Sequence, residues 1–345
     1  MDKKKVIFVV NPISGTNNKK YVINALPKII DSSVIDWKLV YTEFPGHAAQ
    51  IAKSAAQDGV DVVVAIGGDG TVNEVARSLT HTQTALGIIP CGSGNGLARH
   101  LMIPLDPIKA LRTLNECVIE DLDYGLINGI PFFCTCGVGF DAFVSSKFAA
   151  AGKRGLFTYL ENTLREGLKY KPEKYEIEVD GLDGEKTHYD ALLIACANAS
   201  QYGNNVYIAP SASMNDGLMD VTIMEPFPIY EAPQVVLQLL NKTITSNSRI
   251  KTLKCKKLRI YRENPGVIHF DGDPVMAGKD ILVELINNGL KVVVNSQASQ
   301  STSPLLRIFA DFYNDVYNTV GDDLLQVNRS IRSINKDLLR KLKRM

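Results

Sequence analysis

The chain has 345 residues, of which 45% are apolar and 22% are charged, a composition typical of a globular protein large enough for two domain cores. Its 38 basic and 37 acidic residues leave a formal net charge of +1, so overall charge predicts no binding to nucleic acid. The apolar run at residues 6–10 stops at Asn11-Pro12; a signal peptide needs roughly 7–15 apolar residues and a membrane helix roughly 20, so we expect a cytoplasmic protein.

The first third of the chain alternates strand and helix patterns. Apolar, β-branched runs predict strands at residues 5–10, 37–42, 61–66 and 85–89. Helical patterns lie between them: the first ends near residue 30, the second spans residues 47–57 and the third ends at residue 79. Such alternation predicts a doubly wound α/β domain, in which the ligand site lies beyond the carboxyl ends of parallel strands. Three glycine-bearing loops follow predicted strands and should therefore meet at this edge.

The segment Gly67-Gly68-Asp69-Gly70-Thr71-Val72-Asn73-Glu74 joins the third predicted strand to the helix that follows it. Glycines let the backbone approach a phosphate closely, and the start of a helix directs N–H groups and a positive dipole at an anion. Because a carboxylate repels phosphate, we interpret Asp69 as a ligand for a divalent cation or as the acceptor of a proton from an attacking hydroxyl. A hairpin turn would also use Asp-Gly, but the helical pattern after this loop disfavours it.

Two further loops should border the same crevice. They are Asn11-Pro12-Ile13-Ser14-Gly15 and Gly92-Ser93-Gly94-Asn95, which offer hydroxyl and backbone donors suited to phosphate, although each alone is also typical of an ordinary turn. The patterns GxxxxGK[ST] and, after the first strand, GxGxxG are absent, which disfavours a Walker-type ATPase and a standard dehydrogenase.

From about Asp123 the pattern changes to short strands separated by turns. Strands are predicted at residues 132–138, 175–179, 189–197, 219–224, 258–261, 267–270, 281–286 and 290–295, with helices near 143–169 and 230–240. We predict an α/β domain at residues 1–123, a β-rich substrate domain at 124–296 and a helical C-terminal extension at 297–345. The last predicted helix is basic and amphipathic, which fits an anionic bilayer or a docking site on protein equally well.

The second domain supplies acidic residues. Asp271 and Asp273 follow a predicted strand and could hold magnesium or accept a proton from a hydroxyl nucleophile, although a solvated Asp-Gly turn has the same local sequence. Asp216, in the segment from Ser213 to Asp220, is open to the same two interpretations.

Neither the cysteines nor the histidines indicate a catalytic site. Cys134 and Cys136 allow a metal or redox site, but the six cysteines lack CxxC spacing and are more typical of buried strand thiols. The five histidines are scattered and no G-x-S-x-G motif accompanies them, which disfavours a hydrolase.

With these motifs in this order, the chain resembles the catalytic domain of diacylglycerol and sphingosine kinases, over roughly residues 4–295 and most of all the bacterial soluble lipid kinases. The resemblance implies an N-terminal domain like that of NAD kinases and phosphofructokinases, a C-terminal antiparallel β-sandwich, and an active site between them. The ATP-binding set given by the loops and the resemblance is Asn11, Pro12, Ser14, Gly15, Thr42, Gly67, Gly68, Asp69, Gly70, Thr71, Asn73, Glu74, Gly92, Ser93, Gly94 and Asn95.

The resemblance also implies roles for the acidic loops. Ser213, Asp216 and Leu218 match a magnesium site that supports the active site in bacterial relatives. Asp271 and Asp273 match an Asp-Gly-Glu segment whose acids activate the lipid hydroxyl, and Asp273 is one methylene shorter than the usual Glu.

We therefore predict a Mg²⁺- and ATP-dependent kinase with a lipid hydroxyl as acceptor, in which Asp271, Asp273 and Asp69 are the candidate catalytic residues. Its expected partners are ATP and a lipid substrate at a membrane surface. We expect the protein to be cytoplasmic, with possible peripheral attachment to the inner surface of the membrane. A kinase for a soluble acceptor such as NAD, and a catalytically silent nucleotide- or membrane-binding protein, are the alternatives. The identity of the lipid and a homodimeric state are left open.

Overall fold

The computed structural model describes residues 3–13, 19–151, 170–180 and 186–296. The predicted extension at 297–345 lies outside the described residues, as do Ser14 and Gly15. No helix among the described residues is long and apolar enough to cross a membrane.

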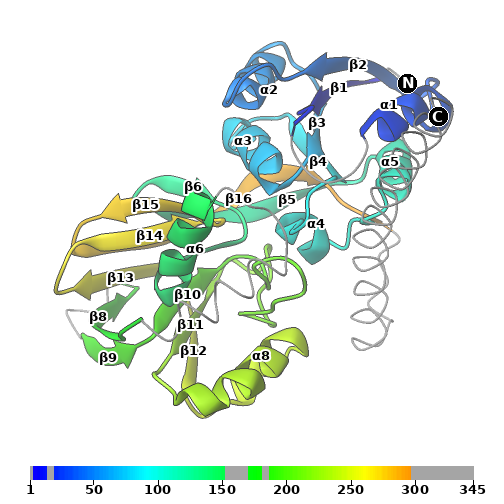
Figure 1. Ribbon diagram of the computed structural model, residues 1–345. Coiled ribbons are helices and arrows are strands. Elements are labelled where there is room, and N and C mark those ends of the chain that lie inside the picture. Colours follow the sequence, from blue (N-terminus) through cyan, green and yellow to red (C-terminus); the bar gives the residue numbers. More distant parts are fainter. Residues whose placement is uncertain (1–2, 14–18, 152–169, 181–185, 297–345) are drawn as a thin grey trace, which may run out of the picture. The chain divides into compact units, whose positions relative to one another are not determined.

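The first part of the chain forms a parallel sheet with helices on both faces (Figure 1). Its strands run in the order β2 (Ile35–Tyr41), β1 (Lys4–Val10), β3 (Val62–Gly67) and β4 (Ala85–Pro90). Helices α2 (His47–Gln57) and α3 (Asp69–Leu79) pack on one face, and α1 (Lys19–Ile29) and α5 (Pro107–Glu116) pack together on the other. Every residue of β3 and β4 is buried, as expected for apolar central strands covered on both sides.

The second part is an antiparallel β-sandwich. One layer is a six-stranded sheet, in the order β12 (Ile250–Cys255), β11 (Met219–Met224), β10 (Leu193–Ala197), β7 (Thr135–Gly139), β14 (Gly266–Phe270) and β15 (Asp273–Ala277). The other layer contains β16 (Asp280–Val293), β13 (Lys257–Arg262), β8 (Glu173–Val179) and β9 (Thr187–Ala191). In the same layer β5 (Ile119–Ile127) pairs with β16, and β6 (Ile130–Phe132) pairs with β5. Buried apolar side chains from both layers form the core, among them Val138, Ile223, Ile260 and Val283.

Strand β16 joins the two parts into one ten-stranded sheet. It pairs antiparallel with β13 and β5, and its far end pairs parallel with β4 at Val292 and Leu86. The predicted fold class, an α/β domain followed by an antiparallel β-sandwich, is thus confirmed. The predicted domain boundary at residue 123 falls inside β5.

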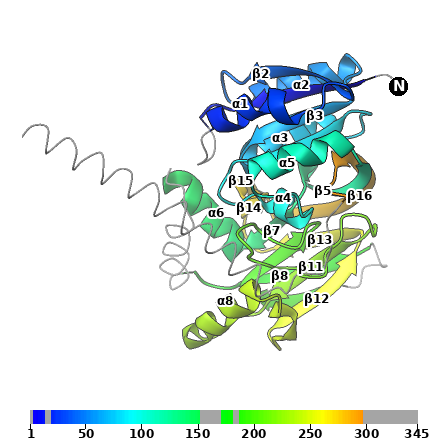
Figure 2. The ribbon, with the colours of Figure 1, turned by 90° about the vertical axis from the view of Figure 1, so that its right-hand side faces the viewer.

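Five further helical elements, two of them 3₁₀ turns, occur among the described residues. Helix α4 (Gly96–His100) follows the second glycine loop, and α6 (Phe140–Ala151) packs on strands β7, β14 and β15. Helix α8 (Ala232–Leu240), preceded by the 3₁₀ turn η1 (Ile229–Glu231), lies by the start of β12 (Figure 2). The 3₁₀ turn η2 (Ile244–Ser246) connects α8 to β12.

Candidate active site

The central glycine loop is the junction of β3 and α3. Gly67 is the last residue of β3, and α3 begins at Asp69 with Gly68 as its extended N-cap, so the predicted strand–loop–helix is present. The N–H groups of Thr71 and Val72 donate to Gly68 O at 3.0 and 3.1 Å. The first N–H groups of a helix have no acceptor within the helix, so this end of α3 suits an anion.

The loop Gly92–Asn95 packs directly on the first loop. A β-carbon on Gly92 would lie 2.7 Å from Gly68 Cα, and one on Gly94 would lie 2.9 Å from Asp69 Oδ2. Real β-carbons essentially never come this close, so glycine is required at both positions for the loops to touch.

Asp69 ties these two loops together. Its Oδ2 accepts the Asn95 N–H at 2.9 Å, and its Oδ1 accepts the Gly96 N–H at 2.8 Å. Sequence reasoning placed this carboxylate toward a cation or a substrate proton; in the structure both of its oxygens already accept backbone donors. Each oxygen retains a second lone pair, so a direct chemical role for Asp69 stays a prediction.

A loop from the sandwich covers the other side of Gly94. The Asn204 N–H donates to Gly94 O at 3.3 Å, and a β-carbon on Gly203, which has φ of +114°, would lie 3.2 Å from Gly94 Cα. Arg99 Nε donates to the same carbonyl at 2.9 Å, and Arg99 also reaches Asn205 Oδ1 at 3.3 Å. Sequence reasoning missed this loop, although its Gly-Asn-Asn sequence is a turn signal.

The remaining residues predicted to bind the nucleotide follow strands β1 and β2, lie in helix α3 or belong to the Gly92–Asn95 loop. Asn11 and Pro12 follow β1, and the Asn11 side chain accepts the Ile13 N–H at 3.1 Å. Thr42 follows β2, is buried and donates its N–H to Val10 O at 2.9 Å. Glu74 Oε1 accepts the Gly46 N–H at 3.3 Å, which links α3 to the start of α2. Thr71 and Asn73 are buried in α3, whereas Ser93 is exposed in its loop.

Asp271 lies in a left-handed turn after β14, with φ of +50°. Its carboxylate accepts three backbone N–H groups, from Phe133 at 2.9 Å, Cys134 at 2.7 Å and Thr135 at 3.2 Å. Burial nevertheless raises the pKa of Asp271 to about 6, against the lowering effect of these three donors. A carboxyl group with a pKa near neutrality can exchange a proton readily at physiological pH.

Asp273 is the more exposed of the two acids, with 60% of its side chain accessible. Its Oδ2 lies 3.7 Å from Arg77 NH2, and the Arg77 guanidinium stacks 4.9 Å above the Phe270 ring. Arg77 comes from α3, so the helix that begins at Asp69 also contacts the acid-bearing turn. Sequence reasoning missed Arg77, because nothing in its local pattern distinguishes it from a solvated helix residue.

Cys134 connects the two sets of predicted residues. Its thiol has a pKa well above the ordinary value because it is buried and because Asp271 and Asp69 both lie within electrostatic range. The Sγ atom would also lie 3.5 Å from a β-carbon on Gly96. Cys134 therefore lies between Asp271, which accepts its N–H, and Gly96, whose N–H donates to Asp69.

All six cysteines are free thiols. No group of three or more His, Cys, Asp or Glu side chains placed to hold a metal occurs in the described ranges. Cys134 and Cys136 are both buried, Cys136 within β7 and Cys134 directly before it.

The loop predicted to bind magnesium is held by other contacts. Asp216 Oδ1 accepts the Leu218 N–H at 3.1 Å, and its Oδ2 lies 2.8 Å from Lys254 Nζ, while Ser213 Oγ donates to Asn215 Oδ1. Because the Lys254 ammonium already neutralises the one carboxylate of the predicted set, the side chains as arranged do not fit a resident magnesium ion. The predicted set Ser213, Asp216 and Leu218 is not part of the cluster around Cys134.

A buried polar network lies beneath the site. His269 Nε2 is 3.0 Å from Asp141 Oδ2, which also accepts the Tyr202 hydroxyl at 3.1 Å, and His269 is 1% exposed. His100, beside the glycine loops, has its pKa lowered to about 4 by burial and accepts the Ser200 N–H at 3.1 Å. Both histidines form hydrogen bonds with residues far from them in the sequence.

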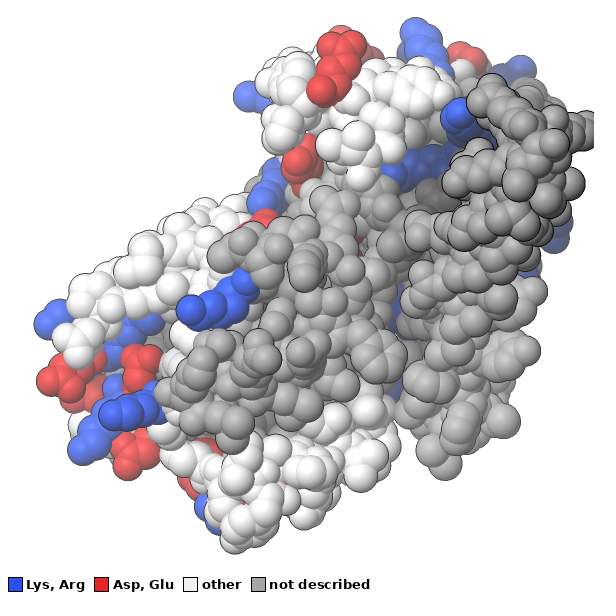
Figure 3. All heavy atoms as spheres, in the orientation of Figure 1, with Lys and Arg blue, Asp and Glu red and all other residues white. Residues whose placement is uncertain are grey.

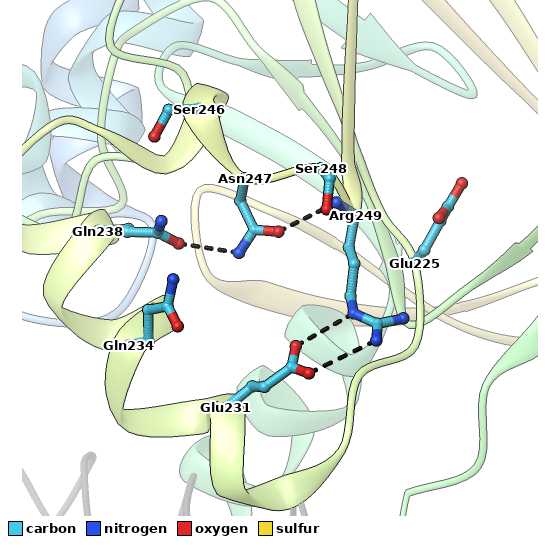
Figure 4. Close-up of a pocket in the computed structure, with 8 residues that line it drawn as sticks. All are labelled: Glu225, Glu231, Gln234, Gln238, Ser246, Asn247, Ser248 and Arg249. Carbon is cyan, nitrogen blue, oxygen red and sulfur yellow. Dashed lines mark hydrogen bonds and ion pairs between the residues drawn. The ribbon is translucent and has the colours of Figure 1, made fainter.

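A separate polar hollow of about 600 Å³ lies beside α8 (Figure 4). Its lining includes Glu231, Gln238, Asn247 and Arg249, which bond to one another across it. None of the predicted nucleotide or acid residues lines it.

Comparison with known proteins assigns both parts of the chain. The diacylglycerol kinase catalytic domain matches residues 5–127, and the YegS C-terminal domain, described as NAD kinase β-sandwich-like, matches residues 134–294. The chain thus joins a diacylglycerol kinase catalytic domain to a YegS-type C-terminal domain. Both matched ranges agree with the α/β part and the sandwich seen in the structure.

The relatives described below each share less than 30% sequence identity with this chain. A diacylglycerol kinase of Bacillus subtilis is 29% identical over 78% of this chain and 90% of its own length. An uncharacterized protein of Synechocystis is 28% identical over 77% of this chain, and the match spans only 65% of that relative. A crystal structure of a diacylglycerol kinase from Bacillus anthracis, at 20% identity, superposes with a TM-score of 0.67 over 87% of this chain and all of that one, which supports the same fold.

Proposed function

We propose that this protein transfers the γ-phosphoryl group of ATP to the hydroxyl of a lipid of the diacylglycerol or sphingoid type. The observation that carries the proposal is that Cys134 links the two acids: its N–H donates to Asp271, and its Sγ lies beside Gly96, whose N–H donates to Asp69. An anion-binding helix start is thereby placed near a buried carboxyl group. The matched diacylglycerol kinase catalytic domain, and the name of the Bacillus subtilis relative, support a lipid as the acceptor.

ATP enters as its magnesium complex, with the triphosphate over Gly67–Thr71. The first turn of α3 supplies N–H donors, and the Gly92–Asn95 loop borders the phosphates from the other side. In the absence of a Walker lysine, positioning by backbone donors and the charge of the ATP-bound magnesium must lower most of the barrier.

Asp271 is the proposed base. A carboxylate has about four acceptor positions, and three of them are filled by the N–H groups of Phe133, Cys134 and Thr135, two on Oδ1 and one on Oδ2. Oδ2 therefore retains one position for the lipid hydroxyl. As the hydroxyl oxygen bonds to the γ-phosphorus and the bond to the β–γ bridging oxygen breaks, the hydroxyl proton passes to Asp271 and ADP leaves.

Arg77, on α3, and Asp273, at the start of β15, act on the same step. The ion pair and the stacking of Arg77 on Phe270 fix the turn that carries Asp271 relative to the helix that binds phosphate. Asp273 thus positions the base rather than accepting the proton itself.

The test is transfer of label from γ-labelled ATP by the full chain, with a mixed lipid extract dispersed in detergent and magnesium present. Label should appear in the organic phase, and mass spectrometry of the product identifies the acceptor. Label on a water-soluble acceptor without detergent would favour a kinase for a soluble substrate. ATP binding with no transfer to any acceptor would overturn the kinase proposal altogether.

A further inference from the structure

Helix α8 exposes an apolar side to solvent. The helix, Ala232–Leu240, contains no charged residue, and Ile229 and Tyr230 precede it. Ile229, Tyr230 and Leu237 are 55, 77 and 62% exposed. Tyr230, Pro233 and Leu237 recur at helical spacing, so with Ile229 they form one strip, here called the α8 stripe. A helix on the surface of a soluble protein normally turns polar residues outward.

The opposite side of α8 is firmly attached. Val235 is buried in a core cluster with Ile244 and Ile250. Glu231 pairs with Arg249 at 3.1 Å, and Gln238 accepts the Asn247 side-chain N–H at 2.8 Å, which ties the helix across the polar hollow to the lead-in of β12 (Figure 4). The α8 stripe is therefore presented by a fixed helix, and exposure of its side chains is a property of the fold.

The stripe is also connected to the candidate active site. The Tyr207 N–H donates to Leu239 O at 2.9 Å, and Lys242 Nζ lies 4.4 Å above the Tyr207 ring. Tyr207 ends the loop that contacts Gly94 through Asn204. An object bound at the α8 stripe would thus lie one loop away from the proposed phosphate site.

Charge around the stripe favours an anionic surface. In Figure 3 the surface at the lower edge, where Figure 1 places α8, is mostly uncharged. Lys242 and Lys251 are exposed after the helix and at the start of β12. Of the nearby acids, Glu231 is neutralised by Arg249, which leaves Glu225 at the edge of the hollow.

We propose that the α8 stripe docks this protein on the surface of an anionic lipid bilayer. Apolar side chains flanked by lysines bind such surfaces through burial in the interface and attraction to anionic headgroups, and a tyrosine suits the boundary between them. The four exposed residues of the stripe fall short of the roughly 800 Å² per partner that a stable protein interface buries, which disfavours a second copy as occupant. The choice of a bilayer rests on the proposed function, because the acceptor lipid resides there.

The experiment is co-sedimentation of the full chain with sucrose-loaded vesicles of phosphatidylcholine, with and without phosphatidylglycerol. The double variant Tyr230→Glu, Leu237→Glu should lower partitioning onto the mixed vesicles by at least about tenfold, because two apolar side chains lose their burial. The matched control is Tyr21→Glu, which changes a 66% exposed tyrosine on α1 and should bind as the unaltered protein does. Equal partitioning of the double variant and the unaltered protein would overturn the proposal.

Two further readouts separate the explanations. Light scattering that shows a dimer dissociated by the double variant, with vesicle binding unchanged, would assign the stripe to a second copy and overturn bilayer docking. Transfer of label to detergent-dispersed lipid should be the same in the double variant and the unaltered protein. If no lipid is phosphorylated but the double variant still loses vesicle binding, the kinase proposal fails and the docking surface stands.

Discussion

Asp271 has a structural task and, in the proposed mechanism, a chemical one. Three backbone donors hold its carboxylate in place, and burial raises its pKa to about 6. Asp273, by contrast, is mostly exposed and paired with Arg77. The structure thus separates two acids that the sequence left as equal candidates for the base.

Asp271→Asn should lower kcat roughly 100- to 10,000-fold, the usual contribution of a general base. Asp273→Asn should cost less than about tenfold in kcat, because it removes an exposed ion pair.

For the unaltered enzyme, kcat/KM should fall as pH drops through about 6, since protonated Asp271 cannot accept the hydroxyl proton. Label-transfer assays on detergent-dispersed lipid measure all three quantities. A larger loss with Asp273→Asn would transfer the base role to Asp273.

The same titration predicts how stability changes with pH. The pKa of Asp271 is raised from 3.8 to about 6 by folding, so the folded state binds the proton more tightly than the unfolded chain. The resulting stabilisation is full below about pH 4 and is lost as pH rises through about 6. Asp271→Asn cannot titrate, so its Tm relative to the unaltered protein should shift upward between about pH 4 and 7. A constant difference in Tm across that range would contradict the raised pKa.

At the scale of elements, the two glycine loops form a single unit closed by Asp69. Gly92→Ala would place a β-carbon 2.7 Å from Gly68 Cα, so we expect the loops to separate, Tm to fall and kcat to drop about 10- to 100-fold.

The β-carbon added by Gly70→Ala has no neighbour within 4 Å, so this variant should keep its Tm. It should nevertheless weaken ATP binding if the triphosphate lies over this loop.

Gly278→Ala, in the turn before β16, is the matched control, because its β-carbon also has no neighbour within 4 Å. Calorimetric titration with ATP and thermal unfolding measure these effects. ATP affinity in Gly70→Ala equal to that of Gly278→Ala would place the phosphates elsewhere.

Sequence patterns predicted individual strands better than their partners. Residues 189–197 form one continuous strand pattern, yet β9 ends at Ala191 and β10 begins at Leu193, because the chain changes sheets at Leu192. Conversely, Asn287-Asn288-Gly289 is a typical turn sequence, but β16 continues through it as a bulge, with Asn288 donating its N–H to Asp123 at 2.8 Å. Both outcomes depend on pairing between distant segments, which local propensity does not encode.

The candidate site likewise combines features that the sequence predicts with features that it does not. Loops at the ends of neighbouring parallel strands could be predicted to meet, because the topology brings those ends to one edge. The sequence could not predict the parts played by Arg77, Cys134 and the loop around Gly203, because these arise from contacts between the two halves of the chain. The role of Asp69 as a tie between loops likewise depends on donors that lie 26 and 27 residues away in sequence.

At the scale of the whole molecule, β16 makes the two parts share a sheet. This strand supplies hydrogen bonds to β4 of the α/β part and to β13 of the sandwich, and its side chains contribute to both cores. Arg77 and the loop around Gly203 add contacts at the candidate site. Unfolding of the sandwich should therefore remove the support of the parallel sheet.

Ile260→Ala tests this coupling. Ile260 on β13 is fully buried in the sandwich, so its truncation should cost about 2–5 kcal/mol. Trp37, the single tryptophan, lies on β2 in the other part, and its fluorescence should report the same lowered Tm as far-UV circular dichroism. Met276→Ala, at a 67% exposed position on β15, should leave both signals within about 0.5 kcal/mol of the unaltered protein. If Ile260→Ala lowers the dichroism transition while Trp37 melts at its original temperature, the two parts unfold independently and the shared strand does not couple them.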